Sequence, residues 1–330
     1  MATMKRVAAR ANVSISTVSR VVNQSGYVAP SVRENVLKAV KELGYQPSSI
    51  ARGLRTSSTR SVGVLVPQLA HPFFGAIAIA AEKHLFAHGY RIFLCSSEED
   101  PHKESAYIDM LLSQRVDGVI LVSTGTSEPN AKRLLDAKIP MVLVDRDLPQ
   151  MDVDRVLADN YKGAQDLVHY LATLGHRRIG MIGANVRRLS SFKDGIAKAG
   201  LEFDPKLEVV IEKPSFEMAV AATRKLLKRA HPPTAIMAEN DLLAVGVLNG
   251  ALRTGLHIPD DLSVTGFDDV PLAAYIFPEL TTVSQPYDLM AERATQCLLS
   301  RIIDSRMTPV SEILPTRVVV RHSTGPAQKR

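Results

Sequence analysis

Apolar residues in the first 45 positions recur at the spacing of three short helices. A serine at position 14 stands just before the second helix, which is expected to begin at Ile15, because a serine hydroxyl can accept a bond from the free N–H groups of a helix's first turn. A third helix is expected over 30–43, with Pro30 at its first position and Gly44 after its end. The apolar stripes are, helix by helix, Val7, Ala8 and Ala11, then Val18, Val21 and Val22, then Val32, Val36, Leu37, Val40 and Leu43.

This order of helix, tight turn and helix is typical of a helix-turn-helix motif, which places its second helix in the major groove of DNA. The outward side of the second helix is polar, apart from Ile15, and carries Arg20. Two helices of an ordinary bundle with a solvated face would show the same pattern, so the pattern alone leaves both interpretations open.

From Ser61 onward, apolar runs of strand length alternate with amphipathic helices, as in doubly covered parallel sheets. A final helix over 288–303 and a strand over 313–321 are too few to fold alone and must return to one or both halves. The predicted strands are 62–66, 92–95, 119–122, 141–144, 179–182, 207–211, 235–238 and 262–265, and the predicted helices are 73–88, 103–115 and 130–137, followed by helices that end near 174, 199, 228 and 253.

The pattern predicts a small all-α helix-turn-helix head and an α/β core of two doubly wound subdomains. We assign the head to 1–46, a linker with weak helical character to 47–59, and the two-lobed core to 60–330. The N-lobe is expected at about 60–158 and 288–315, and the C-lobe at about 159–287 and 316–325.

Charge distinguishes the head from the core. Residues 1–60 hold ten basic and two acidic side chains, a balance of +8, whereas the rest of the chain holds 30 basic and 32 acidic ones. A basic head on a nearly neutral body is typical of a nucleic-acid-binding module attached to another domain. The charge therefore favours the DNA-binding interpretation of the helix-turn-helix pattern.

Other features of the composition exclude several classes of protein. Cys95 and Cys297 lie far apart without metal-ligand spacing, so we expect buried thiols in a reducing cytoplasm, with neither a disulfide framework nor a metal site. The chain has no apolar run of membrane length, and its amino end lacks the apolar core of a signal peptide. We expect a cytoplasmic protein that does not bind membranes.

At this point the chain resembles the lactose-repressor/galactose-repressor family of bacterial transcription regulators over nearly its whole length. The head matches the family pattern at Val7-Ala8, Ala11, Val13-Ser14 and 17–23, and it departs at Arg6, Asn12 and Ala29, where an acid, a glycine and a serine cap are usual. Further matches are Tyr45-x-Pro47, Ala51-Arg52-x-Leu54, His71-Pro72-Phe73-Phe74, Val144-Asp145-Arg146, Asp159-Asn160, Gly175-His176-Arg177-Arg178-Ile179, Asn240-Asp241, Gly266-Phe267-Asp268-Asp269 and Leu280-Thr281-Thr282.

The resemblance implies how the head would read DNA. Ile15, Ser16 and Arg20 would face base edges, where an arginine fork suits a guanine and an isoleucine can meet a thymine methyl. Phosphate contacts position a protein without specifying sequence. Their candidates are Thr3, Ser14, Thr17, Asn23, Tyr27 and Arg33, each of which has a helix cap or a solvated side chain as its alternative.

The linker matches the family at Ala51 and Leu54, and in this family the equivalent leucine wedges into the minor groove and kinks the duplex. A leucine packed on a neighbouring domain is the alternative. A one-residue wedge needs a partner wedge, which implies a homodimer on a near-palindromic operator. The carboxyl end carries no leucine heptad, so we expect no tetramer.

The core resembles periplasmic binding proteins, whose ligand lies at the carboxyl ends of the strands. A small carbohydrate-like effector is implied, and a sugar, a sugar acid or a phosphosugar remains open. Asp159, Asn160 and Asp268 have a helix cap as their alternative, Arg187 could replace Arg188, and His71 reads as a turn residue. The candidate effector-binding residues are Phe73, Phe74, Arg146, Asp159, Arg188, Phe216, Asn240 and Asp268.

Together these features predict a transcription regulator, most simply a repressor, whose operator affinity changes when the effector binds. The rivals are a Rossmann-type enzyme and a secreted solute-binding protein. The turn after the first predicted core strand, 66–71, has no glycine fingerprint, and the chain has no P-loop or zinc-protease motif, so no catalytic residue, cofactor or metal is expected.

Overall fold

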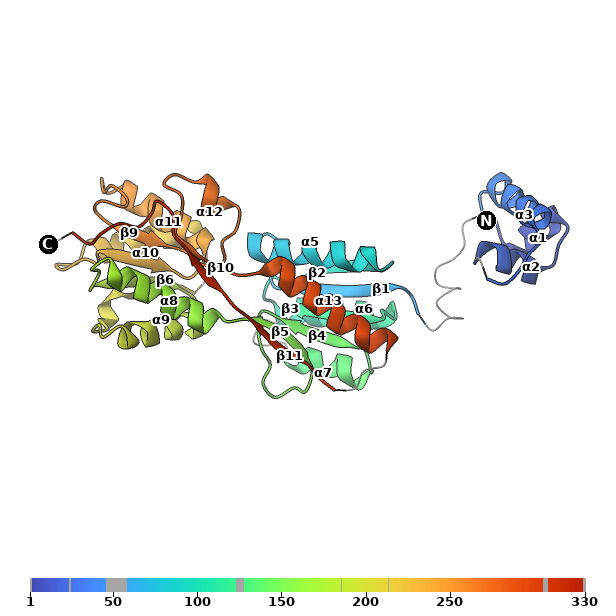
Figure 1. The fold of residues 1–330 in the computed structure, drawn as a ribbon, viewed down its shortest axis with the longest axis horizontal. Helices are drawn as coiled ribbons and strands as arrows, with labels where there is room; N and C mark the ends of the chain where they lie inside the picture. Colours follow the sequence, from blue (N-terminus) through green and yellow to red (C-terminus); the bar gives the residue numbers. More distant parts are fainter. Residues whose placement is uncertain are drawn as a thin grey trace. The chain divides into compact units, whose positions relative to one another are not determined.

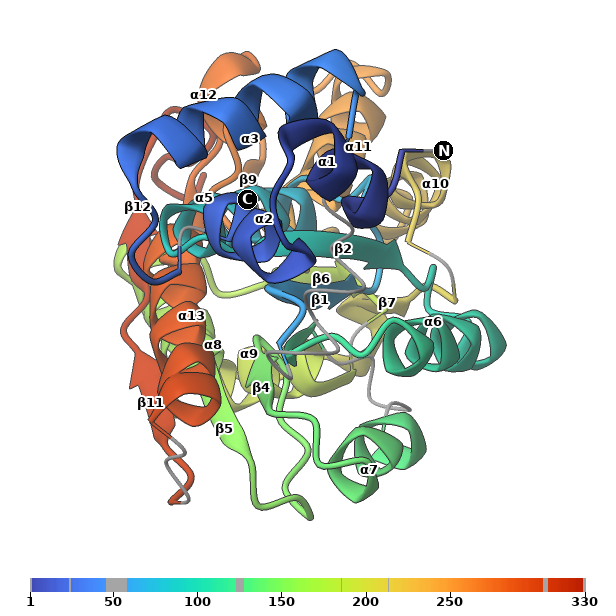
Figure 2. The same ribbon diagram turned by 90° about the vertical axis from the view of Figure 1, so that its right-hand side faces the viewer.

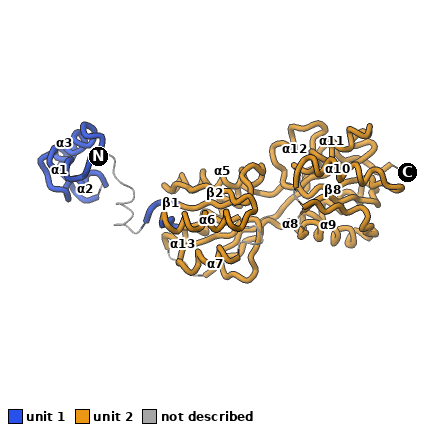
Figure 3. Tube along the Cα trace, turned by 180° about the vertical axis from the view of Figure 1, so that it is seen from behind, with its two compact units in different colours: residues 1–61, 115–117 blue, residues 62–114, 118–330 orange. Residues whose placement is uncertain are grey.

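The computed structural model describes residues 2–23, 25–45, 58–122, 128–184, 186–212, 214–304 and 308–328. The chain forms two compact units (Figure 3). The first comprises Met1–Ser61 with Arg115–Asp117, and the second comprises Val62–Gln114 with Gly118–Arg330. No helix in these described ranges is both long and apolar enough to cross a membrane.

The head consists of α1 (Met4–Ala11), α2 (Ile15–Val22) and α3 (Pro30–Glu42), which pack around Val7, Val18 and Val36 (Figure 1). The three helices match the predicted ones, except that Leu37 is 51% exposed and does not join the packing. Two departures from the family pattern have visible effects. Asn12 ends α1 in the left-handed region with φ 53°, a conformation that Asn tolerates, and Ala29 gives α3 no side-chain cap.

The N-lobe is built on a six-stranded sheet in the order β11-β5-β4-β3-β1-β2, whose paired strands are parallel wherever their register is defined. Helices α5 and α13 cover one face of this sheet, and α6 and α7 cover the other (Figures 1 and 2). The elements are β1 (Ser61–Val66), α5 (Pro72–Ala87), β2 (Arg91–Ser96), α6 (Pro101–Ser113), β3 (Gly118–Val122), α7 (Glu128–Asp136), β4 (Met141–Val144), β5 (Asp154–Ala158), α13 (Tyr287–Ile303) and β11 (Ser311–Leu314).

The C-lobe contains a four-stranded parallel sheet in the order β7-β6-β8-β9 and a two-stranded antiparallel ribbon of β10 and β12. Its helices pack in pairs, α8 with α9 and α10 with α11. The elements are α8 (Asn160–Thr173), β6 (Ile179–Gly183), α9 (Val186–Lys198), η1 (Pro205–Leu207), β7 (Glu208–Val210), α10 (Phe216–Leu227), β8 (Ala235–Ala238), α11 (Asp241–Leu252), β9 (Ser263–Thr265), α12 (Leu272–Tyr275), β10 (Thr282–Ser284) and β12 (Arg317–Val319).

One strand of the N-lobe sheet is held by contacts that are distant in the sequence. Strand β5 is absent from the predicted elements because it begins with Asp154 and Arg155. The Asp154 carboxylate is nevertheless buried, since it accepts bonds from Arg301 Nε at 2.5 Å and from the Val310 N–H at 2.6 Å. These contacts fix the end of α13 and the start of β11 to β5.

The single strand predicted over 313–321 is wrong. Pro315 separates two strands with different partners, β11 on β5 in the N-lobe and β12 on β10 in the C-lobe. Proline has no N–H to donate to a sheet, so the strand breaks where the chain changes lobe. The cysteines also differ from expectation, because Cys95 is buried but Cys297 only half-buried.

Candidate functional site

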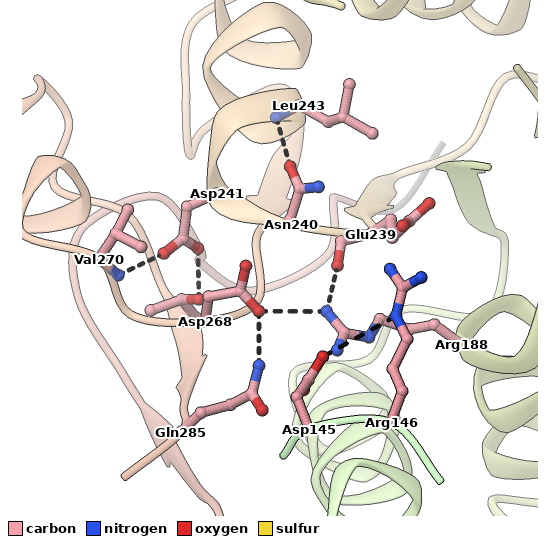
Figure 4. A network of polar contacts seen from close by, with 11 residues as sticks. Asp145, Arg146, Arg188, Glu239, Asn240, Asp241, Leu243, Asp268, Val270 and Gln285 are labelled. Carbon is pink, nitrogen blue, oxygen red and sulfur yellow. Dashed lines mark hydrogen bonds and ion pairs between the residues drawn. The ribbon is translucent and has the colours of Figure 1, made fainter. Parts of the chain in front are cut away.

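Polar side chains gather where strands of both lobes end (Figure 4). Asp145 and Arg146 follow β4 in the N-lobe, Asp268 follows β9 in the C-lobe, and Arg188 comes from the first turns of α9. The carboxyl ends of parallel strands share one edge of a sheet, so residues distant in sequence meet there. We call Asp145, Arg146, Arg188, Asp268 and Gln285, together with the neighbouring His71 and Asn160, the interlobe cluster.

Arg188 is central to this cluster. Its guanidinium donates to the Glu239 carbonyl at 2.9 Å and to Asp268 Oδ1 at 3.2 Å, and it lies 3.8 Å from the centroid of the Phe267 ring. The side chain is only 12% exposed, whereas Arg187 is exposed. Of the two arginines left open by the sequence, the structure brings Arg188 into the cluster.

Asp268 is fully buried and has a left-handed backbone with φ 107°. Gln285 Nε2 donates to Asp268 Oδ1 at 2.7 Å, the same oxygen that accepts from Arg188. Burial raises the pKa of Asp268 to about 7, although the Arg188 charge acts in the opposite direction. Neither Asp268 nor Asp269 caps a helix, since Asp269 instead pairs with Arg321 at 2.6 Å.

The N-lobe contributes Asp145 and Arg146. Arg146 Nε lies 3.8 Å from Asp145 Oδ2. Burial raises the pKa of Asp145, and the charges of Arg146 and Arg188 oppose this shift, so the C-lobe arginine acts on an N-lobe carboxyl. Asp145 is missing from the predicted effector residues, and its position directly before Arg146 in a matched motif is the signal that could have found it.

Two predicted effector residues cap helices. Asn240 Oδ1 accepts from the Leu243 N–H at 2.9 Å at the start of α11, and Asp159 Oδ1 accepts from the Lys162 N–H at 3.0 Å at the start of α8. The cap role that the sequence left open for Asp159 is therefore present. For Asn240, which is 7% exposed and follows the Arg188-bonded Glu239, the cap holds the side chain beside the cluster.

The predicted aromatic residues lie in different surroundings. Phe73 and Phe74 are 2% and 7% exposed, belong to the N-lobe core, and have ring centroids 5.5 Å apart. His71 stacks on Phe74 at 5.1 Å. Burial lowers the pKa of His71 to about 4, with Arg188 and Arg146 as further causes, so the ring is neutral at pH 7. Phe216 opens α10 and is half-buried, and no contact among the described residues joins it to the cluster.

Several buried polar atoms around the cluster have no hydrogen-bond partner among the described residues. A buried polar atom left unsatisfied costs about 1–3 kcal/mol, so such atoms call for a partner from outside the chain. They are His71 Nδ1, Asp145 Oδ1, Asn160 Oδ1 and Gln285 Oε1. Gln285 is a second residue that the sequence analysis misses, because β10, the strand that it directly follows, is not among the predicted strands.

The head presents the predicted outer face of α2 to solvent. Ile15 is 50% exposed, and Ser16 and Arg20 are also exposed. Among the phosphate candidates, Thr3 and Ser14 accept bonds from Arg6 and Thr17 N–H groups as helix caps, and Asn23 donates to the Ser19 carbonyl. Thr17 and Arg33 are half-buried, Tyr27 is 86% exposed, and Ala51 and Leu54 lie outside the described residues.

The comparison with known proteins finds a matching family for the head and another for the core. Residues 3–48 match the bacterial regulatory proteins of the lacI family, and residues 168–324 match the periplasmic binding protein-like domain. The HTH-type transcriptional repressor PurR of Shigella dysenteriae serotype 1 is 36% identical over 333 residues, which cover 98% of this chain and 97% of that protein.

Solved structures agree with this assignment. The transcriptional regulator CelR in complex with cellobiose is 32% identical, with a TM-score of 0.74 over 98% of this chain and 100% of that one. The lac repressor dimer bound to operator and the anti-inducer ONPF is 26% identical, with a TM-score of 0.87 over 98% of this chain and 99% of that one. These relatives are regulators and not enzymes, which removes the Rossmann-type enzyme as an alternative. The chain therefore belongs to the lacI family of bacterial regulatory proteins and is a DNA-binding transcription regulator.

Proposed function

We propose that this regulator is a repressor that binds a near-palindromic operator as a homodimer, and that a neutral, polyhydroxylated effector at the interlobe cluster changes its operator affinity. In this proposal 1–46 reads DNA, 47–59 links, and 60–330 binds the effector and dimerises, with the lobes divided as expected from the sequence. The observation that carries it is the set of unpartnered buried atoms around Arg188.

The chemistry of those atoms favours one effector class. Asn160 Oδ1 and Gln285 Oε1 are amide oxygens that accept hydrogen bonds, so an effector that donates to them would satisfy both. Sugar hydroxyls do so. A carboxylate or phosphate offers acceptors only, and both arginines already have carboxylate neighbours in Asp145 and Asp268. We therefore favour a neutral sugar over a sugar acid or a phosphosugar.

Relatives support a sugar without identifying it. One solved structure is a CelR complex with cellobiose, and another is a lacI-family regulator from Enterococcus faecium with bound ribose, which is 28% identical with a TM-score of 0.73. Both names describe ligands of those proteins. For this chain, the donor requirement of the interlobe cluster is the independent argument.

Calorimetry on the full-length protein tests the effector class. Matched triplets such as glucose, gluconate and glucose 6-phosphate, or their ribose and cellobiose counterparts, differ mainly in charge. We expect binding by a neutral member and at least tenfold weaker binding by its charged counterparts. Arg188→Ala should abolish this binding and Arg187→Ala should leave it nearly unchanged. Tighter binding of the charged members would reject the neutral class.

Operator binding tests the remaining part of the proposal. Duplexes selected from a random pool should be bound specifically by the wild type, and Arg20→Ala should lower this specific affinity, because Arg20 is exposed on α2. Arg10→Ala is a matched control, since Arg10 pairs with Glu42 at 2.6 Å within the head. A sugar that binds must change the operator affinity by the same factor by which the operator changes the affinity for the sugar.

An exposed apolar face supports the homodimer. Ile79 and Phe86 on α5 are 73% and 54% exposed, and Leu94 on the edge strand β2 is 43% exposed. Exposed apolar groups of this size mark interaction surfaces. The C-lobe has a second pair of exposed aromatic side chains, Tyr275 and Phe277, which are 81% and 94% exposed.

Sedimentation equilibrium tests this face. Ile79→Asp should shift the protein from dimer to monomer, because a charge would be buried at the interface. The control is Ile313→Asp, which places the same charge on β11, the opposite edge strand, where the side chain is 63% exposed. If the dimer persists in Ile79→Asp but dissociates in Ile313→Asp, the interface lies at the β11 edge of the sheet and not at α5.

A further inference from the structure

The segment that leads from the linker into the core is held by one carboxylate. Asp117 Oδ1 accepts from the Thr59 N–H at 2.8 Å, and Asp117 Oδ2 accepts from the Arg60 N–H at 3.0 Å and from the Ser58 hydroxyl at 2.6 Å. The Thr59 hydroxyl also lies 3.1 Å from Oδ1. One side chain thus binds three consecutive residues, and we call these four residues the linker clamp.

The backbone is shaped for this arrangement. Arg60 has φ 51°, in the left-handed region, and its N–H and the N–H of Thr59 both donate to the Asp117 carboxylate. Successive N–H groups that converge on one anion form a nest, and hydrogen bonds to a charged acceptor are stronger than neutral ones. The Asp117 N–H in turn donates to the Ser61 carbonyl at 2.8 Å, so the loop and the segment hold each other from both sides.

The position of the clamp in the chain gives it a consequence for function. Ser61 begins β1 and Gly118 begins β3, and these parallel strands pair from Val62 and Gly118 onward. The clamp therefore lies at the amino edge of the N-lobe sheet.

We infer that Asp117 is a positioning residue for operator binding, because it fixes the point and direction from which the linker leaves the core. This inference rests on the proposed function, in which two heads of a dimer reach two half-sites. Without the clamp, the tether between each head and the core would lengthen from about 11 to about 14 residues. Length alone would lower the effective concentration of each head only about 1.4-fold, or about twofold for a dimer.

Loss of the fixed direction in which the linker leaves the core should lower the operator affinity more than the added length of the tether does. If the three residues 58–60 must be ordered again whenever the protein engages an operator, the operator affinity falls on the order of a hundredfold to ten-thousandfold, and by less if part of their order persists. Non-specific binding needs only the positive charge of the heads, so it stays unchanged. The ratio of specific to non-specific affinity therefore separates a positioning role from general damage to the fold.

Two measurements on the full-length protein test the inference, and the first needs no ligand. Hydrogen exchange of the Thr59 and Arg60 amides should be at least tenfold faster in Asp117→Ala than in the wild type, and intermediate in Asp117→Asn, which keeps one acceptor oxygen. Asp109→Ala is the matched control, because Asp109 on α6 forms an exposed ion pair with Arg133 outside the clamp. Equal exchange in all four proteins would overturn the clamp itself.

The second measurement is binding to a duplex selected by the wild type and to an unrelated duplex. We expect Asp117→Ala to lose at least tenfold in specific affinity with unchanged non-specific affinity, and Asp117→Asn to lose less. A specific loss of twofold or below, the amount due to length, would overturn the positioning role. If Asp117→Ala fails to fold, Asp117→Asn decides by the same criterion. If the wild-type protein binds all duplexes equally well, both the proposed function and the positioning role of Asp117 are overturned. The hydrogen-exchange measurement still shows, independently, whether Asp117 holds the Thr59 and Arg60 amides.

Discussion

Replacing Asp268 with asparagine should stabilise the protein above neutral pH while leaving it unchanged in acid. Both bonds to Asp268, from Arg188 and from Gln285, end on the same oxygen, Oδ1. An asparagine with its carbonyl oxygen at that place keeps both bonds and removes only the ionisable group. The variant therefore removes the free energy of charging the buried Asp268 carboxyl together with its repulsion of the Asp145 and Asp241 carboxyls.

The magnitude follows from the pKa of Asp268. Burial raises the pKa to about 7 from the ordinary aspartate value of 3.8. The folded state thus binds this proton more tightly than the unfolded state does, and stability present below pH 4 is lost as the pH rises to about 7. About 3 pKa units correspond to about 4 kcal/mol. Partial relaxation of the site reduces the expected gain in Asp268→Asn to about 2–4 kcal/mol at pH 8.

Chemical denaturation at pH 4.5, 6 and 8 provides the assay. The difference in unfolding free energy between Asp268→Asn and the wild type should be smallest at pH 4.5, grow up to about pH 7 and level off by pH 8. Groups that titrate equally in both proteins cancel in this difference. Asp269→Ala is the control, because it removes the oxygen that accepts the 2.6 Å bond from Arg321 Nη2, so it should destabilise the protein at all three pH values. A pH-independent difference for Asp268→Asn would refute the reasoning.

Three further outcomes concern the head and the linker. Operator affinity should fall steeply with salt, with a log–log slope of about −0.9 per phosphate contact, and a salt-independent binding constant would contradict a DNA-binding role for the +8 charge of residues 1–60. Leu54→Ala should lower operator affinity and DNA bending together, as measured by fluorescence transfer across a labelled duplex, and a wild-type bend angle in the variant would rule out the wedge. Ser14→Ala should cost about 1 kcal/mol of head stability, because Ser14 accepts the Thr17 N–H at 3.1 Å as the cap of α2. Thermal unfolding of the head detects this loss, with the exposed Ser31→Ala as the control that should show none.

Elements with a strong local signal are predictable from the sequence. The predicted helix over 30–43 is observed as α3, and the strands predicted at 141–144 and 235–238 are observed with those bounds. Their apolar residues recur at the helical or strand period, and a serine or a proline marks where a helix begins. The charge of the head is likewise a property of the sequence alone.

Elements defined by distant partners are not predictable in this way. Strand β5 starts with two charged residues, whose burial makes sense only when Arg301 arrives from α13. The split of 313–321 depends on which lobe each half pairs with. The contacts of β5 with Arg301 and with β11 span about 150 residues, and β12 pairs with β10 about 35 residues before it, so no local period records either pairing.

The sequence by itself determined the helices and strands that have a strong local period and the cationic head, because these depend on near neighbours and on composition. Tertiary structure alone decided that Arg188 and not Arg187 meets Asp268, that Asp145 and Gln285 join them, and that Asp117 holds 58–60. The physical reason is burial. A carboxyl becomes a site only when the fold removes it from water and brings a partner of opposite charge or a donor to it, and that pairing is a property of two lobes together.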